Sequence, residues 1–271
     1  MTSIATNTAA IRVQYHGIKN TKIETEAFAR LSSGSRITDA SDDAAGLFIA
    51  SRMKAQISGL ERAVQNSFDG VSLVNSAEAN LNEIRNMVLR MREIAVQMAN
   101  GIYTDTDRSF AQIEIDQLLQ QIDLIAQNAN FNGVALLDGT MQNIGIQTGP
   151  TANERPSIFF KDNTTSGLQI SSVDVTTQAN AKAAMVTLET ALTSISGELS
   201  RAGAYENRFG HTISVLEQTA KATKISRGRI MDADIAAEST KLSKAQVLSQ
   251  ANTAMLAQAN AAPQLALQLI K

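Results

Sequence analysis

Side chains able to do chemistry are few in this sequence and lie far apart. The 271 residues include no cysteine and two histidines, His16 and His211, each inside a stretch of helical periodicity. A chain without cysteine has no disulfides, thiolate metal sites or cysteine nucleophiles. Neither an HExxH zinc motif nor a glycine-rich phosphate loop occurs. We therefore expect no catalytic, cofactor-binding or metal site, and a protein that is not an enzyme.

Asp42 and Asp43 are adjacent carboxylates, which have the residue types of an acid–base dyad but the setting of a helix start. Ser41 comes directly before them, and serine is a preferred N-cap residue. Acidic side chains in the first turn are stabilised by the positive end of the helix dipole. We therefore interpret Ser41 as the cap and the two aspartates as the beginning of a long helix.

Hydroxyl side chains gather in one polar stretch, residues 163–180, where asparagine, serine and threonine dominate. Such a stretch can accept O-linked sugars, and a plain polar loop has the same composition. Both interpretations stay open for the candidate acceptors Thr164, Thr165, Ser166, Ser171 and Ser172.

Charge and hydropathy argue against nucleic-acid and membrane partners. The formal net charge is −2, and the five basic residues of the first 36 are too widely spread for a nucleic-acid patch. No stretch approaches the roughly 18 apolar residues of a membrane span. The last helical segment has an alanine-rich apolar face, unlike membrane-surface helices. We expect neither nucleic-acid binding nor membrane insertion, and the first 20 residues lack the apolar core of a secretory signal.

The elements that carry these residues are mostly long helices with apolar residues at every third and fourth position. Spacing that averages about 3.5 residues keeps one face turned to a partner helix, as in a coiled coil. The stripes comprise Met53, Ile57, Leu60, Val64, Ser67, Val71, Val74, Ala77, Leu81, Ile84, Val88, Met91, Ala95 and Met98; Ala111, Ile115, Leu118, Ile122, Ile125 and Ala129; and Leu188, Leu192, Ile195, Leu199, Ala202, Glu206, Phe209, Ile213, Leu216 and Ala220.

Between these helices the pattern changes to that of short strands. Residues 134–137, 144–146 and 157–161 alternate or border tight turns such as Asp138-Gly139. The predicted fold class is therefore mainly α: a long antiparallel helical coiled-coil or bundle rod from both chain ends, with a small β-hairpin region in the middle.

This pattern predicts two domains, each built from both halves of the chain. Residues 1–41 and 231–271 form an inner terminal coiled-coil domain. Residues 42–180 and 181–230 form a helical rod domain with a short β-rich insert at about 134–180.

The two outermost helices have weaker apolar stripes than the rest of the chain, and a lightly apolar helix is marginal alone. We predict that helical periodicity breaks near Gly228, and that the last helix, residues 234–262, stops or kinks at Pro263. Asn252 is a candidate register-setting residue within it. Assembly with other copies is the leading hypothesis, and the candidate seam residues are Ile4, Ile11, Ile18, Leu31, Leu248, Met255, Ala259 and Leu265.

Several segments, in order along the chain, carry a family resemblance. They are ARLSSGSRI at 29–37, DDAAGLFIASRM at 42–53, REIAVQMAN at 92–100, FNGVALLDG at 131–139, ENRFGHTISVLEQT at 206–219 and SKAQVLSQANTAMLAQANAAPQLALQLIK at 243–271. Together they resemble bacterial flagellin, the flagellar filament subunit. The likeness covers roughly 1–140 and 183–271, and the short middle segment indicates a form without large outer domains.

The resemblance implies a structural subunit that polymerises into an extracellular flagellar filament for swimming motility. It implies that the terminal domain lines the filament core, with the rod domain around it. It also implies export in unfolded form, without a cleaved signal peptide. The expected partners are further copies of the chain, the flagellar export apparatus, an export chaperone, the cap and the hook-junction proteins.

The surface around Arg90, Ile94 and Glu114 of the rod domain is predicted to be a contact site. Arg90 and Ile94 are neighbours four residues apart, and an isoleucine just off the main stripe needs cover from an adjacent helix or another molecule. In flagellins this surface stacks on the next subunit, and an animal innate immune receptor recognises the same region. Arg90 and Glu114 match the receptor-contact pattern of the family, whereas Ile94 replaces the more usual leucine.

Two alternatives remain open from the sequence. A hook–filament junction protein of the same superfamily shares the terminal plan, although the very short insert argues against it. A surface-exposed binding or adhesion module can be built on the same rod, and saturable glycan binding by a monomer is its distinguishing property.

Overall fold

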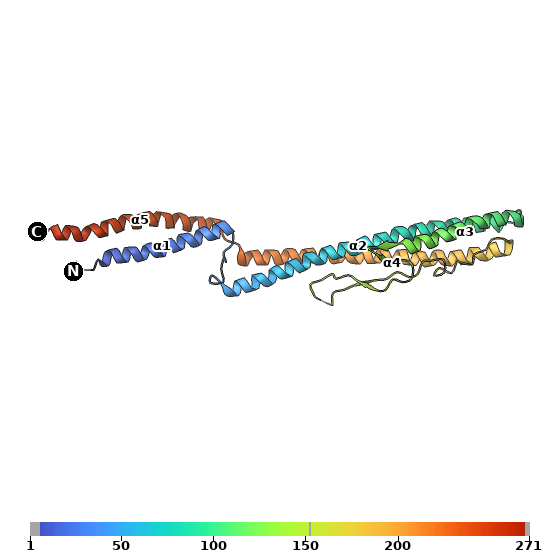
Figure 1. The fold of residues 1–271 in the computed structure, drawn as a ribbon, viewed down its shortest axis with the longest axis horizontal. Coiled ribbons are helices and arrows are strands. Elements are labelled where there is room, and N and C mark those ends of the chain that lie inside the picture. Colours follow the sequence, from blue (N-terminus) through green and yellow to red (C-terminus); the bar gives the residue numbers. More distant parts are fainter. Residues whose placement is uncertain (1–5, 152, 269–271) are drawn as a thin grey trace. The chain divides into compact units, whose positions relative to one another are not determined.

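The computed structural model describes residues 6–151 and 153–268, with the side chains of the last helix described as far as Ala262. Five long helices dominate, which confirms the predicted mainly α fold (Figure 1). The elements are α1 (Thr8–Ser33), α2 (Ala44–Met98), α3 (Asp105–Asn128), β1 (Asn130–Phe131), β2 (Val134–Ala135), β3 (Ile144–Gly145), β4 (Ser157–Ile158), α4 (Gln178–Met231) and α5 (Ile235–Gln268). No helix among the described residues is long and apolar enough to cross a membrane.

The chain divides into two units. One contains residues 1–55 and 222–271, and the other contains residues 56–221. The division of the chain into functional domains at residues 41 and 231 stays a prediction, because these units follow packing alone.

The core of unit 56–221 is built from the predicted stripes. Leu81, Ile84 and Met91 of α2, Ile122 of α3 and Leu188 of α4 are fully buried in one apolar cluster. Each helix contributes one face, as its 3.5-residue spacing requires. These stripes therefore hold the unit together within a single chain.

The middle segment packs onto the same core. A hairpin joins β1 to β2, and its two turn residues, Asn132 and Gly133, have φ angles of 50° and 80°. Positive φ at both positions is the type I′ geometry that asparagine and glycine favour. The antiparallel pair β3–β4 follows this hairpin along the chain, and Ile158 and Phe160 are fully buried. The strands are shorter than predicted, and β1 was not predicted.

Helix ends follow local capping chemistry. Ser41 is not the cap of α2: the Asp43 side chain accepts a hydrogen bond from the Gly46 amide at 2.8 Å, and Ser41 lies in the preceding turn. Thr104 caps α3, in a reciprocal capping box with Asp107. The predicted break near Gly228 is displaced, because α4 remains helical to Met231.

In unit 1–55 and 222–271, α1 and α5 run side by side in opposite directions (Figure 1). Gly34 ends α1 with a φ of 67°, the left-handed conformation that glycine adopts freely. The segments that follow α1 and α4 bond to each other, from the Arg36 amide to the Met231 carbonyl and from the Ala233 amide to the Gly34 carbonyl. At its other end, α5 continues past Pro263, so this proline does not stop the helix.

Candidate functional site

The contact between α1 and α5 is made of small and polar residues. Asn20 and Ala27 of α1 are buried, as is Ala245 of α5. The Asn20 side-chain amide donates to the Ala245 carbonyl at 2.7 Å. Near the end of the pair, the Asn7 side-chain amide donates to the Ala259 carbonyl at 2.8 Å. Small side chains let the helices approach closely enough for asparagine to reach the opposite backbone.

Large apolar side chains of α1 point away from this contact. Ile11, Tyr15 and Ile18 are 56%, 67% and 69% exposed. At about 100° per residue, these three positions share one face of the helix, roughly half a turn from Asn20 and Ala27. The helix α1 therefore has a face for α5 and an uncovered apolar face opposite to it.

On helix α5 the exposed apolar residues lie beside the face that meets α1, about 60–80° around the helix from the buried Ala245. Leu248 and Met255 are 43% and 57% exposed, and they lie seven residues apart on one face. Leu31 and Ala259 are half-buried at the α1–α5 contact. Of the remaining candidate seam residues, Ile4 and the side chain of Leu265 lie outside the described residues.

A shallow groove of about 440 Å³ runs along the α1–α5 contact. Val13 and Gly17 line it from α1, and Asn252 and Leu256 line it from α5. A Cβ atom at Gly17 would meet nothing within 4 Å, so the groove is open at that point. Asn252 faces this groove, while the buried amide that joins the helices belongs to Asn20.

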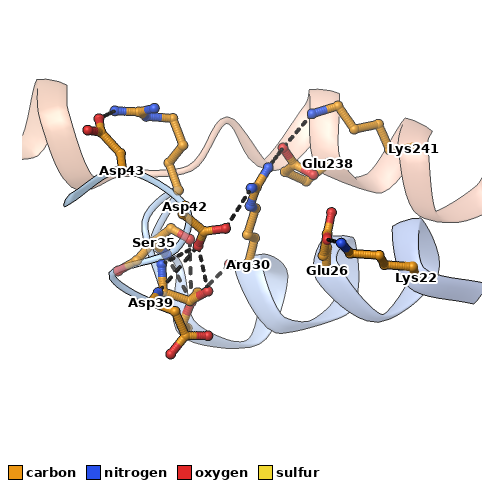
Figure 2. Close-up of polar contacts among 12 residues, drawn as sticks. Lys22, Glu26, Arg30, Ser35, Asp39, Asp42, Asp43, Glu238 and Lys241 are labelled. Carbon is orange, nitrogen blue, oxygen red and sulfur yellow. Dashed lines mark hydrogen bonds and ion pairs between the residues drawn. The ribbon is translucent and has the colours of Figure 1, made fainter. Parts of the chain in front are cut away.

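A polar cluster closes the other end of the helix pair (Figure 2). The Arg30 guanidinium lies 3.5 Å from the Asp42 carboxylate and 3.6 Å from that of Glu238, which is also paired with Lys241 at 2.7 Å. Arg30 thus joins α1 to α5 and to the segment before α2. It is a second contact, beside the asparagines, that ties these elements together.

Asp42 stabilises the turn that precedes α2. Its Oδ2 accepts hydrogen bonds from the Thr38 amide at 3.0 Å, the Thr38 hydroxyl at 2.9 Å and the Asp39 amide at 3.3 Å. These bonds lower the pKa of Asp42 from 3.8 to about 2, and the bond from the Thr38 amide has the largest effect. The Asp42–Asp43 pair is thereby assigned to turn and helix capping.

The predicted surface site on α2 and α3 is brought together only in part. Arg90 donates from Nε to Glu114 at 2.9 Å, and both side chains are about half exposed. Ile94 is 3% exposed and belongs to the buried core. Ile94 is therefore covered by residues of the same chain, and the exposed side chains on this surface are those of Arg90, Glu93 and Glu114.

The candidate sugar acceptors differ in accessibility. Thr165 is 6% exposed, and both its amide and its hydroxyl donate to Asp123, at 2.8 and 2.9 Å. Thr164 is half-buried. Ser166, Ser171 and Ser172 are exposed.

Among the described residues, no group of three or more His, Cys, Asp and Glu side chains is arranged to hold a metal ion. The functional residues that sequence reasoning missed are Asn7, Asn20 and Arg30. Asn7 is the N-cap of α1, whereas Asn20 and Arg30 lie within the helix, so no single polar face marks the three in the sequence.

Comparison with known proteins identifies related chains. Residues 4–142 match the model of the bacterial flagellin N-terminal helical region, and residues 185–270 match that of the C-terminal helical region. The flagellin of Halalkalibacterium halodurans is 38% identical over 91% of each chain. A flagellar filament core protein of Brachyspira hyodysenteriae is 39% identical over 90% of each, and the flagellin of Bacillus subtilis is 35% identical over 98% of each.

Solved structures have the same kind of fold. The crystal structure of Bacillus cereus flagellin is 32% identical, with a TM-score of 0.50 over 56% of this chain and 88% of that one. A putative flagellar hook-associated protein from Vibrio parahaemolyticus gives a TM-score of 0.60 over 70% of this chain and 100% of that one. Its sequence identity is 14%, so this likeness concerns the fold alone.

Proposed function

The chain belongs to the bacterial flagellin family and is a structural subunit of the extracellular flagellar filament, and we propose that its two end segments are the main assembly surface. In this proposal, residues 1–41 and 231–271 form the inner domain of the filament. Residues 42–230 form the surrounding domain and bear the outer subunit contacts.

The observation that carries this proposal is the uncovered apolar face of the terminal helices. Ile11, Ile18, Leu248 and Met255 are all at least 43% exposed within one chain. Fully burying a large aliphatic side chain stabilises by about 1.5–3 kcal/mol. A face of this kind, repeated in every copy, favours polymerisation.

Assembly also supplies the free energy to order the ends. Fixing a backbone residue costs roughly 1–2 kcal/mol in conformational entropy. The small residues of the α1–α5 contact bury little apolar area against this cost, so contacts with other copies complete the balance. We expect slow hydrogen exchange in α1 and α5 within filaments and faster exchange in dilute monomer.

The outer contact rests on Arg90 and Glu114. Their paired, half-exposed side chains make a charged surface on α2 and α3 that suits a neighbouring subunit or an innate immune receptor. Ile94 does not belong to this surface, because it is buried. Ser166, Ser171 and Ser172 are the accessible candidates for O-linked sugars.

Further partners follow from the family. We propose that the chain is exported unfolded, without cleavage of a signal peptide, through the flagellar export apparatus, and that it binds an export chaperone, the cap and the hook-junction proteins. Relatives at 35–39% identity are named flagellin or filament core protein. The junction and adhesion alternatives have no comparable support.

The test is seeded growth. Purified chain added to short filament fragments is expected to elongate them without limit, which a junction protein does not do. Leu248→Asp with Met255→Asp is expected to abolish elongation, because two carboxylates then lie on the assembly face. Gln246→Asp with Gln250→Asp adds the same charges at exposed polar positions of α5 and serves as the matched control. Normal filaments from the Leu248 and Met255 variant, with unit 56–221 still folded by circular dichroism, refute the assignment.

A further inference from the structure

The Ala259 carbonyl of α5 lacks the backbone N–H that usually donates to it within a helix. In an α-helix the carbonyl of residue i accepts the N–H of residue i+4. The residue four places after Ala259 is Pro263, and proline has no backbone N–H. The helix nevertheless continues past this point, to Gln268. A carbonyl without a donor is unfavourable in a packed contact, so Ala259 needs a hydrogen bond from elsewhere.

Asn7 supplies that hydrogen bond. Its Nδ2 donates to the Ala259 carbonyl at 2.8 Å, while its Oδ1 accepts from the Ala10 amide at 3.1 Å. One side chain therefore caps the start of α1 and at the same time satisfies the carbonyl that Pro263 leaves free in α5. Both ends of the amide are in use, which fixes its orientation.

Asn20 repeats the contact farther along the pair. Its amide, 6% exposed, donates to the Ala245 carbonyl at 2.7 Å. Asn7 and Asn20 are 13 residues apart on α1, and Ala259 and Ala245 are 14 residues apart on α5. At about 1.5 Å per residue, both intervals measure roughly 20 Å. The two bonds therefore form together in one antiparallel register.

We propose that Asn7 and Asn20 set the register of α1 against α5, with Pro263 marking the position on α5 that Asn7 recognises. Small apolar residues alone give little preference between one register and a register slid by seven residues. The register decides which exposed apolar residues of α1 and α5 lie at the same height along the helix pair. This inference rests on the proposed assembly function, since the register is what presents Ile11, Ile18, Leu248 and Met255 to other copies.

Disulfide trapping measures the register directly, because the natural chain has no cysteine. Glu24 and Leu242 are opposite positions in the register that the two amides define, and both are half-buried. Glu24→Cys with Leu242→Cys reports that register, and Glu24→Cys with Ser249→Cys reports a slide of seven residues. A slide of that size moves the helices by about 10 Å, beyond the reach of a disulfide. The ratio of the two cross-linking yields in full-length monomer is the measured quantity.

The decisive variant is Asn7→Ser, which keeps an N-cap residue and, with its shorter side chain, lacks the Nδ2 group that donates to Ala259. We expect it to lower the native-to-slid ratio about five-fold, equivalent to roughly 1 kcal/mol for one hydrogen bond. Pro263→Ala returns an N–H to α5, so Asn7→Ser in that background is expected to leave the ratio nearly unchanged. Asn20→Leu is expected to lower the ratio while keeping the helix content. Thr25→Ser, whose hydroxyl bonds its own helix at Thr21, is the control.

An unchanged ratio in Asn7→Ser overturns the proposal, and so does an equal fall with and without Pro263→Ala. The rate of seeded elongation by the same variants measures how the register affects assembly. If the wild-type chain fails to elongate seeds while the chain with Glu24→Cys and Leu242→Cys gives the native cross-link, the assembly function is refuted and the register is left intact. The two failures are therefore distinguishable.

Discussion

Arg90 of α2 and Glu114 of α3 form an ion pair with 2.9 Å between Nε and Oε1. Arg90 also reaches Glu93, one turn farther along its own helix, at 3.3 Å. The hydrogen bond to the Glu114 carboxylate is the largest of the effects that raise the pKa of Arg90 above its usual value. The pair lies over a core that already holds α2 and α3 together, so its main effect is on the charge pattern of the surface.

We therefore predict that Arg90→Ala and Glu114→Ala each slow seeded elongation more than they change thermal unfolding. The coupling between the two residues, measured in a double-mutant cycle, is expected to disappear in 1 M salt because exposed charges are screened there. Arg85→Ala, on the same helix, is the control. Unfolding of the helical unit on removal of either partner contradicts this interpretation.

The hydrogen bonds to Asp42 predict a defined pH dependence. Its pKa of about 2 in the folded chain lies below the ordinary value of 3.8. A lowered carboxyl pKa contributes stability that is fully present above the unfolded pKa and is lost as the pH falls through the folded one. We expect Asp42→Asn to lower the melting temperature at pH 7, and the difference from wild type to vanish between about pH 4 and pH 2. Glu26→Gln, which removes an exposed carboxylate of α1, is expected to show no such trend.

Apolar spacing predicted the helical core, whereas it could not predict how the ends pair. Leu81 and Leu188 are buried as their stripes predict, because a 3.5-residue period places the apolar residues on the one face that packs against a partner helix. Ile94 was expected near the surface and is buried, since spacing within α2 says nothing of where α3 lies. Asn20 donates a buried hydrogen bond across the α1–α5 contact, and an asparagine in a sequence does not reveal the opposite carbonyl that it will reach.

Glu206 occupies a position in the apolar stripe of α4 and predicts a second pH effect. Burial raises its pKa, and Glu78 of α2 raises it further by repulsion and by a hydrogen bond. The folded chain therefore holds this proton more tightly than the unfolded chain, so stability falls as the pH rises through the raised pKa. Glu206→Gln is expected to raise the melting temperature at pH 7 and to match wild type below about pH 4. Calorimetry beside Glu217→Gln, an exposed position on α4, checks this, and a lower melting temperature at pH 7 contradicts it.

Thr165 ties the middle segment to α3 through Asp123. Its amide and hydroxyl both donate to that half-buried carboxylate, and Thr165 itself is 6% exposed. Thr165→Val keeps the shape and removes the hydroxyl donor, and we expect it to destabilise the chain by about 1–2 kcal/mol in urea unfolding, because a half-buried carboxylate oxygen loses its partner. Ser166→Ala, at the adjacent exposed position, is expected to change little.

The same contact decides which hydroxyls are open to modification. A sugar on Thr165 would require the hydrogen bond to Asp123 to break and the side chain to leave the core. We therefore expect mass spectrometry of filaments to find any O-linked sugar on Ser166, Ser171 or Ser172 and none on Thr165. A sugar found on Thr165 of folded chain means that the segment around residue 165 opens after folding. In that case Thr165→Val is expected to lower the free energy of unfolding by much less than the value predicted for the bond to Asp123.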